Sequence, residues 1–380
     1  MTMVDVLRAD HTGGLRRPDW LRELAADFSE GKASEAQLRE GQDRAVRHLI
    51  EKQEACGLRI VSDGEVRRVN FQESFGGAVT GFDAQPYRFQ RPAVAAQSPA
   101  GPPRRVESGL SGEGPAILYR RPVKERLRLV RNLILEEYRF AQAVANVPVK
   151  VTLTGPDRIS QRFEYENSRH VYPDMDAFLA DVVAIEREMI AQVIEAGCRY
   201  IQLDEPGYTA YVDPVLTEQM KARGEDPMAN MERSIAADNA VIEGFPGVTF
   251  AVHICRGGGG GRGGPGWHRE GTYDAIAEKL FNELNFDRFL LEYDSEAAGT
   301  FEALRYFPKD KIAVLGLVSN HGDVESPDYI RGRLKEASRY IDLEQVAICP
   351  RCGLNSVPEE VVWGKLRTIV QVAEEVWGSA

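Results

Sequence analysis

The sequence predicts an α/β protein, a single (β/α)8 TIM barrel, on three observations. Short runs of β-branched and aliphatic residues alternate with longer segments of helical period, as they do around a parallel sheet. Eight such runs occur, which is the number of strands in a closed barrel. The 380 residues, 43% of them hydrophobic, suffice for one large core. We therefore expect one domain over residues 1–380.

The elements follow from local patterns along the chain. The eight expected strands lie near residues 6–10, 58–62, 149–153, 199–203, 248–252, 288–291, 312–317 and 345–348. Residues 174–196 are the clearest helix, because their apolar side chains recur at helical spacing and Gly197 follows as a stop signal. The terminal segment 359–377 has the same period.

Two segments interrupt this alternation. Residues 70–121 are rich in Gly, Pro, Gln and Arg and have no usable period, which predicts a long loop insertion after the second strand, over the site. Residues 255–267, CRGGGGGRGGPGW, lack the GKS or GKT of a phosphate-binding loop. We interpret the glycine-rich part, 257–266, as a mobile lid or a plain flexible loop.

The composition restricts the partners. The net charge of −11 and the isoelectric point near 5.3 argue against nucleic acid and anionic membranes, which require a basic field. No segment approaches the roughly 18 apolar residues of a spanning helix, and MTMVDVLRADH lacks the apolar stretch of a signal peptide. Five cysteines are too few for a disulfide framework. We expect a cytoplasmic enzyme for small molecules, and a homo-oligomer is compatible with this composition.

Chemically active residue types gather directly after the expected strands. Barrel enzymes carry their catalytic groups at the C-terminal ends of the strands. In chain order these residues are Asp63, Glu65, Asp204, His253, Cys255, Glu292, His321 and Cys352. Any one of them alone would be interpreted as a helix cap or a core residue. Together they predict one functional site at the mouth of the barrel.

Four of these residues form a candidate metal site. His253 and Cys255 are an HxC pair at the end of a strand, so both side chains leave the strand on the same face. Glu292 and Cys352, after two later strands, add a carboxylate and a second thiolate. Because zinc accepts this mixture of ligands in tetrahedral geometry, we predict a zinc ion bound by all four.

Two of the ligands have alternatives. Cys349 and Cys352 form a CxxC, but a zinc ribbon needs a second CxxC pair, which the chain lacks. We choose Cys352, beside Gly353, as the ligand and place Cys349 in the barrel wall. Glu292 could instead form a salt bridge with an arginine.

The charge of this ligand set favours one reaction. Two thiolates and a carboxylate leave zinc with a net charge of about −1, which makes it a poor source of hydroxide. Such a site is suited to bind a substrate thiol, remove its proton at neutral pH and keep the sulfur nucleophilic. We expect alkylation of a thiol, with a small-molecule thiol and an alkyl donor as the partners.

Several short motifs together resemble the catalytic barrel of cobalamin-independent methionine synthase over nearly the whole chain. They are DGE at 63–65, LDEP at 203–206, HIC at 253–255, the glutamate at 292 and CGL at 352–354. The resemblance implies that the four ligands named above bind zinc. It also implies that Glu65 and Asp204 hold the amino group of a thiol such as homocysteine, and that His321 handles a proton during methyl transfer.

The chain differs from the full-length synthase, which has two barrels. Single-barrel relatives include short methionine synthases and the epoxyalkane:coenzyme M transferases, which open an epoxide with a zinc-bound thiolate. Four arginines near the mouth could bind a sulfonate or a carboxylate; they are Arg16, Arg17, Arg67 and Arg68.

These considerations rank the candidate functions. Methyl transfer to homocysteine, with Asp204 and His321 as catalytic residues, comes first. Epoxide opening by coenzyme M is the alternative, in which His321, Tyr208 or Tyr211 would protonate the alkoxide. A metal-free decarboxylase of the uroporphyrinogen type and a noncatalytic metal-binding protein are the remote alternatives.

Overall fold

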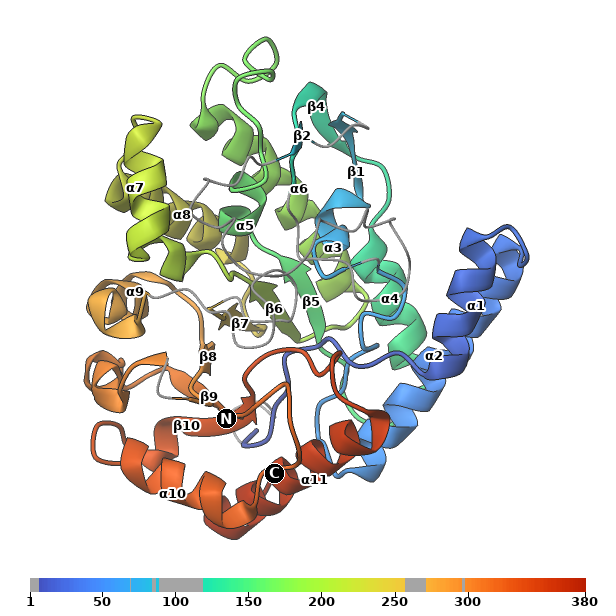
Figure 1. The fold of residues 1–380 in the computed structure, drawn as a ribbon, viewed down its shortest axis with the longest axis vertical. Helices are drawn as coiled ribbons and strands as arrows, with labels where there is room; N and C mark the ends of the chain where they lie inside the picture. The colour runs from blue at the N-terminus through green and yellow to red at the C-terminus, as the bar shows by residue number, and fades with distance from the viewer. Residues whose placement is uncertain (1–6, 69, 84–86, 89–118, 257–270, 296–297) are drawn as a thin grey trace, which may run out of the picture.

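The protein is built around a parallel sheet that forms most of a barrel wall. The computed structural model describes residues 7–68, 70–83, 87–88, 119–256, 271–295 and 298–380. Neighbouring strands are all parallel, in the order β10-β9-β8-β7-β6-β5. They are β5 Val151–Thr154, β6 Tyr200–Asp204, β7 Thr249–Ile254, β8 Arg288–Glu292, β9 Ile312–Val318 and β10 Val346–Pro350. Figure 1 shows this sheet at the centre, with helices around its outside.

The first two predicted strands are reduced to single bridges, which extend the sheet at its two ends. Ala9 pairs with Ile348 of β10, and Val61 pairs with Val149 just before β5. The predicted strand at 58–62 was too long: Val61 donates to Pro148, and the ladder cannot extend backwards because proline has no N–H to donate. The segment at 6–10 begins in residues that are not described. The predicted TIM-barrel class is confirmed.

Helices cover the barrel from outside, and the two clearest predictions are confirmed. Helix α6 begins after Asp174, whose side chain accepts the Ala177 N–H, and ends before Gly197 at φ 111°. The α-helices outside the insertion are α1 Asp19–Ser29, α2 Glu35–Ala55, α4 Leu133–Gln142, α5 Pro156–Ser160, α6 Met175–Glu195, α7 Pro214–Ala222, α8 Pro227–Ile242, α9 Ala277–Glu283, α10 Pro327–Ala337 and α11 Glu359–Trp377. The short 3-10 helices are η2 Tyr208–Tyr211, η3 Tyr273–Ala275, η5 Phe301–Tyr306 and η6 Leu343–Gln345.

A cluster of buried apolar side chains lies inside the barrel. This inner layer takes its members from successive wall positions: Leu7, Ile60, Tyr200, Ala251, Leu290, Val314, Ala347 and Cys349. It forms part of a packed core, as is usual inside such barrels. None of the helices in the described part of the chain combines the length and the apolar character needed to cross a bilayer.

The insertion at 70–121 is more ordered than the structureless loop that we expected. It contains α3 Glu73–Gly76, β1 Val79–Phe82, β2 Tyr87–Arg88 and β3 Tyr119–Arg120. Strand β1 pairs antiparallel with β4, Val123–Leu129, and β2 pairs with β3. The alternation was hidden because the register of β1 shifts between Thr80 and Phe82, around Gly81 at φ 113°. Residues 84–86, 89–118 and the glycine-rich segment 257–266 lie outside the described residues.

Four fully buried acidic side chains lie between α5, α6 and α8, behind the end of β6. They are Asp157, Glu186, Glu205 and Asp238. The Glu205 carboxylate accepts the N–H groups of Asp157 (3.0 Å) and Arg158 (2.9 Å), which fixes the first turn of α5. Burial and the nearby Asp157 raise the pKa of Asp238 to about 8, and burial and Asp238 raise those of Glu186 and Glu205. Asp238 therefore favours its protonated form at neutral pH, and burial disfavours the charged forms of Glu186 and Glu205.

We predict that this cluster makes stability fall as pH rises. Between pH 4 and 8 the folded protein retains a proton on Asp238 that the unfolded chain, with an aspartate pKa of about 3.9, has released. Asp238→Asn is uncharged at every pH. The free energy of unfolding of the wild type, from urea titration, should fall relative to this variant by up to about 1.4 kcal/mol per pH unit between pH 5 and 8.

The exposed Asp328 supplies the control, because Asp328→Asn removes a carboxylate that is 91% accessible. The difference in the free energy of unfolding between Asp328→Asn and the wild type should stay constant with pH. A constant difference for Asp238→Asn as well would contradict a protonated cluster.

Candidate metal and active site

The strand ends bring the candidate ligands to one mouth. His253 lies in β7 and Cys255 directly follows that strand, while Cys352 comes two residues after the end of β10. Asp204 at the end of β6 is the register partner of His253. Glu292 ends β8, the next strand along the wall. Parallel strands thus place side chains from distant parts of the sequence side by side.

Three of the four predicted ligands form a group that could hold a metal ion. The ligand atoms of His253, Cys255 and Cys352 all lie within 4.8 Å of one another. The Nδ1 atom of His253 lies 3.3 Å from the Leu290 carbonyl oxygen, and Nε2, which is buried, has no hydrogen-bond partner among the described residues. A proton on Nδ1 leaves Nε2 as the free lone pair that a metal needs. One imidazole and two thiols are a donor set that zinc accepts.

The two thiols influence each other. The neighbouring Cys352 lowers the pKa of Cys255, and Cys255 raises that of Cys352. Burial opposes a charge on His253, but the neighbouring Cys255 raises its pKa. The site is therefore arranged to carry a thiolate. Cys349, in contrast, is 1% exposed within the inner barrel layer, which confirms its predicted place in the wall.

Glu292 lies beside this group but is held by other partners. Its Oε2 accepts the Arg256 N–H at 2.9 Å, and its Oε1 lies 3.4 Å from Nη2 of Arg351. Arg351 also pairs with Asp294 at 3.0 Å. The salt bridge to an arginine, which the sequence left as an alternative, is present, and metal binding by Glu292 stays a prediction. Sequence reasoning missed Arg351, although it directly precedes Cys352.

Glu65 and Asp204 form an acidic pair at the mouth. Glu65 has φ 57°, and its Oε1 accepts the Thr152 hydroxyl at 2.8 Å. Gly13 leaves room for it, since a Cβ there would lie 3.2 Å from that oxygen and 2.5 Å from Thr152. Burial and then the Glu65 charge raise the pKa of Asp204 to about 7. Such a pair is suited to accept a cationic group.

The predicted arginines make contacts within the chain. Arg68 is 2% exposed and binds Glu137 at 2.7 Å and the Thr152 carbonyl. Arg17 donates to the carbonyls of residues 65, 66 and 68. Arg67 pairs with Asp43 at 2.7 Å, and Arg16 pairs with Asp19 at 2.8 Å. All four guanidinium groups therefore serve the fold, and a role in substrate binding stays a prediction.

The proposed proton donors lie in two different environments. His321 is exposed just beyond β9, with Nδ1 2.8 Å from the Ser319 hydroxyl. Tyr208 and Tyr211 are buried in the acidic cluster, where Tyr208 donates to Asp238 at 2.5 Å and Tyr211 donates to Asp157. These bonds occupy the two tyrosines, whereas His321 is open to solvent.

Comparison with known proteins supports a common family. A family model described as "Cobalamin-independent synthase, Catalytic domain" matches residues 269–375. The uncharacterized protein YxjG of Bacillus subtilis is 31% identical over 384 residues, covering 97% of this chain and 94% of the relative. A methionine synthase of Sulfurisphaera tokodaii is 26% identical over 375 residues, covering 98% and 93%.

Solved structures support the same fold. A putative vitamin-B12 independent methionine synthase from Listeria monocytogenes superposes with a TM-score of 0.72 at 24% identity, covering 98% of each chain. A B12-independent methionine synthase from Shewanella sp. W3-18-1, in complex with selenomethionine, gives 0.72 at 21% identity, covering 98% of this chain and 97% of that one.

We predict one bound metal ion per chain that depends on two thiols. Cys255→Ser and Cys352→Ser should each lose most of the metal, because a serine hydroxyl is a far weaker ligand than a thiolate. Metal content is measured by mass spectrometry of the purified protein. Cys349→Ser is the matched control and should keep its metal, because Cys349 lies in the barrel core. Full occupancy in both ligand variants would refute this site.

Proposed function

Since the chain belongs to the cobalamin-independent methionine synthase superfamily, we propose that it is a zinc-dependent enzyme that transfers an alkyl group to a substrate thiol. The observation that carries the proposal is the group of His253, Cys255 and Cys352 at the barrel mouth, in which His253 and Cys255 are buried. Zinc bound there would supply the positive charge that lowers the pKa of a substrate thiol. Glu292 is the fourth ligand in this proposal, and its ion pair with Arg351 would orient the carboxylate.

The residues around the group support methyl transfer to homocysteine over the alternatives. Glu65 and Asp204 offer carboxylates to the ammonium group of an amino-acid thiol, and the register places Asp204 beside His253. The sulfonate of coenzyme M would need free arginines, but Arg17 and Arg68 bind the chain itself. A metal-free decarboxylase would not need a thiol pair beside a histidine. Homocysteine is therefore the proposed acceptor.

His321 is the proposed residue for the proton on the alkyl-donor side. Its imidazole is exposed beyond β9, and Ser319 holds Nδ1 at 2.8 Å. The Asp294 carboxyl, which pairs with Arg351, also interacts electrostatically with His321. An exposed imidazole that is oriented through one nitrogen can donate a proton from the other.

We predict that the thiol substrate binds the metal directly. Addition of homocysteine should release roughly one proton per site near neutral pH, because a metal-bound sulfur is a thiolate. Calorimetry in buffers of different ionisation enthalpy measures this release, and X-ray absorption should report an added sulfur. Glu65→Gln should weaken binding of homocysteine but not of 2-mercaptoethanol, which has no amino group. Coenzyme M tests the alternative acceptor. If neither homocysteine nor coenzyme M adds a sulfur to the metal shell, thiol activation is refuted.

We predict that His321→Ala lowers kcat by about 10² to 10⁴-fold, the contribution of general acid catalysis. Zinc content and homocysteine affinity should stay the same, because Ser319 and Asn320 are the partners of this imidazole. Steady-state kinetics and metal analysis measure both effects. His170→Ala, at another exposed histidine, is the control with normal turnover. Normal turnover of His321→Ala would remove it from the mechanism, and loss of zinc would make it a ligand.

A further inference from the structure

A tyrosine hydroxyl lies at the point where the pairing of β7 with β8 ends. The register of these two strands ends with Ile254 opposite Leu291. The Tyr273 hydroxyl donates to the Ile254 carbonyl oxygen at 2.5 Å and accepts the Glu292 N–H at 2.9 Å. Because Cys255 directly follows Ile254, this hydroxyl joins the two backbone segments that carry two of the proposed metal ligands.

The chemistry of the three groups fixes the direction of both hydrogen bonds. A carbonyl oxygen can only accept, so the phenol proton of Tyr273 points to Ile254. A backbone N–H can only donate, so Glu292 takes a lone pair of the same oxygen. The Tyr273 side chain is fully buried, and its ring lies 5.3 Å from the Tyr293 ring. The hydroxyl therefore has one orientation that satisfies both backbone groups.

Glu292 is also held through its carboxylate. Its Oε2 accepts the Arg256 N–H at 2.9 Å, and Nε of Arg256 donates to the Gly271 carbonyl oxygen at 3.1 Å. Gly271 is packed closely, since a Cβ there would lie 2.6 Å from the Thr209 carbonyl oxygen. The segment from Gly271 to Tyr273 thus binds Glu292 at its backbone and, through Arg256, at its carboxylate.

The spacing of the two strand ends matters because each zinc ligand must lie about 2.0 to 2.3 Å from the ion. The ligand atoms of His253, Cys255 and Cys352 already lie within 4.8 Å of one another. Glu292 must reach the same ion from the neighbouring strand, and the Tyr273 hydroxyl binds its backbone N–H. Groups that hold a ligand without touching the metal typically change metal affinity by about 10 to 100-fold.

We propose that Tyr273 is a positioning residue for the metal centre: its hydroxyl holds Glu292 at the distance from Cys255 at which both can bind one ion. The inference rests on the proposed function, because it takes zinc as the ion and Glu292 as its fourth ligand. The phenol acts through the backbone and touches neither metal nor substrate. A purely structural hydroxyl would instead stabilise the fold with or without metal, and the zinc affinity of the folded protein would not depend on it.

The test compares Tyr273→Phe with Tyr293→Phe. Each variant keeps its aromatic ring and loses one hydroxyl, but the Tyr293 hydroxyl is buried without a hydrogen-bond partner among the described residues. Competition with a chelator measures the zinc dissociation constant, and circular dichroism checks the fold. Tyr273→Phe should bind zinc about 10 to 100-fold more weakly, whereas Tyr293→Phe should keep the wild-type affinity. With Co²⁺ in place of zinc, the visible absorption bands, which depend on ligand geometry, should shift in Tyr273→Phe alone.

A double-mutant cycle shows whether the hydroxyl acts through the carboxylate. Glu292→Gln keeps the backbone N–H and replaces the carboxylate with a weaker ligand. In that background Tyr273→Phe should change the zinc affinity by less than about twofold, because two changes that remove the same interaction are not additive. Additive losses of affinity would overturn the positioning of Glu292 by Tyr273.

The remaining outcomes separate this role from the proposed function. A folded wild-type protein that binds no zinc would overturn both. Zinc that is bound by the wild type and lost in Cys255→Ser, with undiminished affinity in folded Tyr273→Phe, would overturn only the positioning role. An equal loss of affinity in Tyr293→Phe would also overturn it, since that hydroxyl has no partner among the described residues.

Discussion

The candidate site depends on the parallel register of β6, β7 and β8. On each strand, alternate residues face the barrel interior, so that Ala251 lies in the inner apolar layer and His253, two residues later, lies at the mouth. Leu290 and Glu292 repeat this relation on β8. If β7 slipped by one residue, the His253 side chain would point outward to the surrounding helices, and Ile254 would take its place at the mouth. The packed inner layer opposes such a slip.

A buried ion pair joins the seam where strand pairing is weakest. Residues 7–15 make only two bridges to the wall, but Asp10 binds Lys150 at 2.7 Å, and both side chains are fully buried. Burial opposes the charge on Asp10, yet Lys150 and Arg288 lower its pKa. Removing one partner would leave an uncompensated buried charge, which costs about 3 to 5 kcal/mol. The pair therefore links the N-terminal segment to the start of β5.

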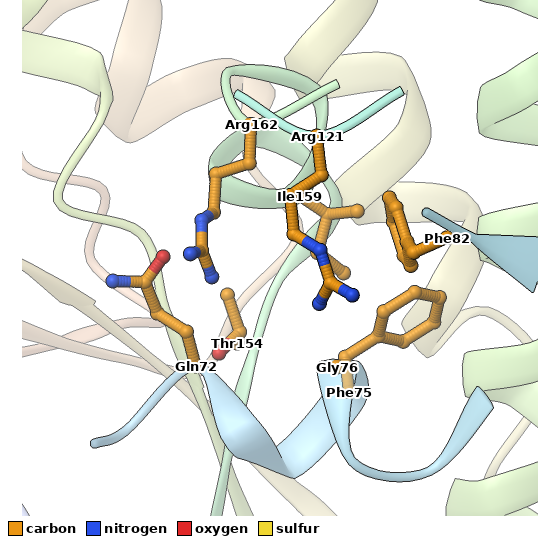
Figure 2. A pocket seen from close by; sticks show the side chains of 8 residues that line it. All are labelled: Gln72, Phe75, Gly76, Phe82, Arg121, Thr154, Ile159 and Arg162. Atoms are coloured by element: carbon orange, nitrogen blue, oxygen red, sulfur yellow. The ribbon is translucent and has the colours of Figure 1, made fainter. Parts of the chain in front are cut away.

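The mouth is divided by charge. Acidic groups lie beside the metal group, whereas Arg121 and Arg162 line a hollow together with Thr154, which ends β5 (Figure 2). Glu205, which follows β6, fixes the first turn of α5, and Arg162 follows that helix.

The sequence by itself determined the barrel class, helices such as α6 and α11, and the candidate ligands, because these depend on periodicity and on residue types directly after strands. It could not resolve β1 and β4, whose pairing is remote and interrupted by a bulge. The roles of the arginines were also decided only in three dimensions. Arg68 follows a predicted strand, which suggested a place at the mouth, yet its guanidinium binds Glu137. Arg162 belongs to none of the motifs, and its buried Nε has no hydrogen-bond partner among the described residues. The sequence shows that an arginine follows a strand, but only tertiary packing decides which carboxylate, if any, lies beside its guanidinium.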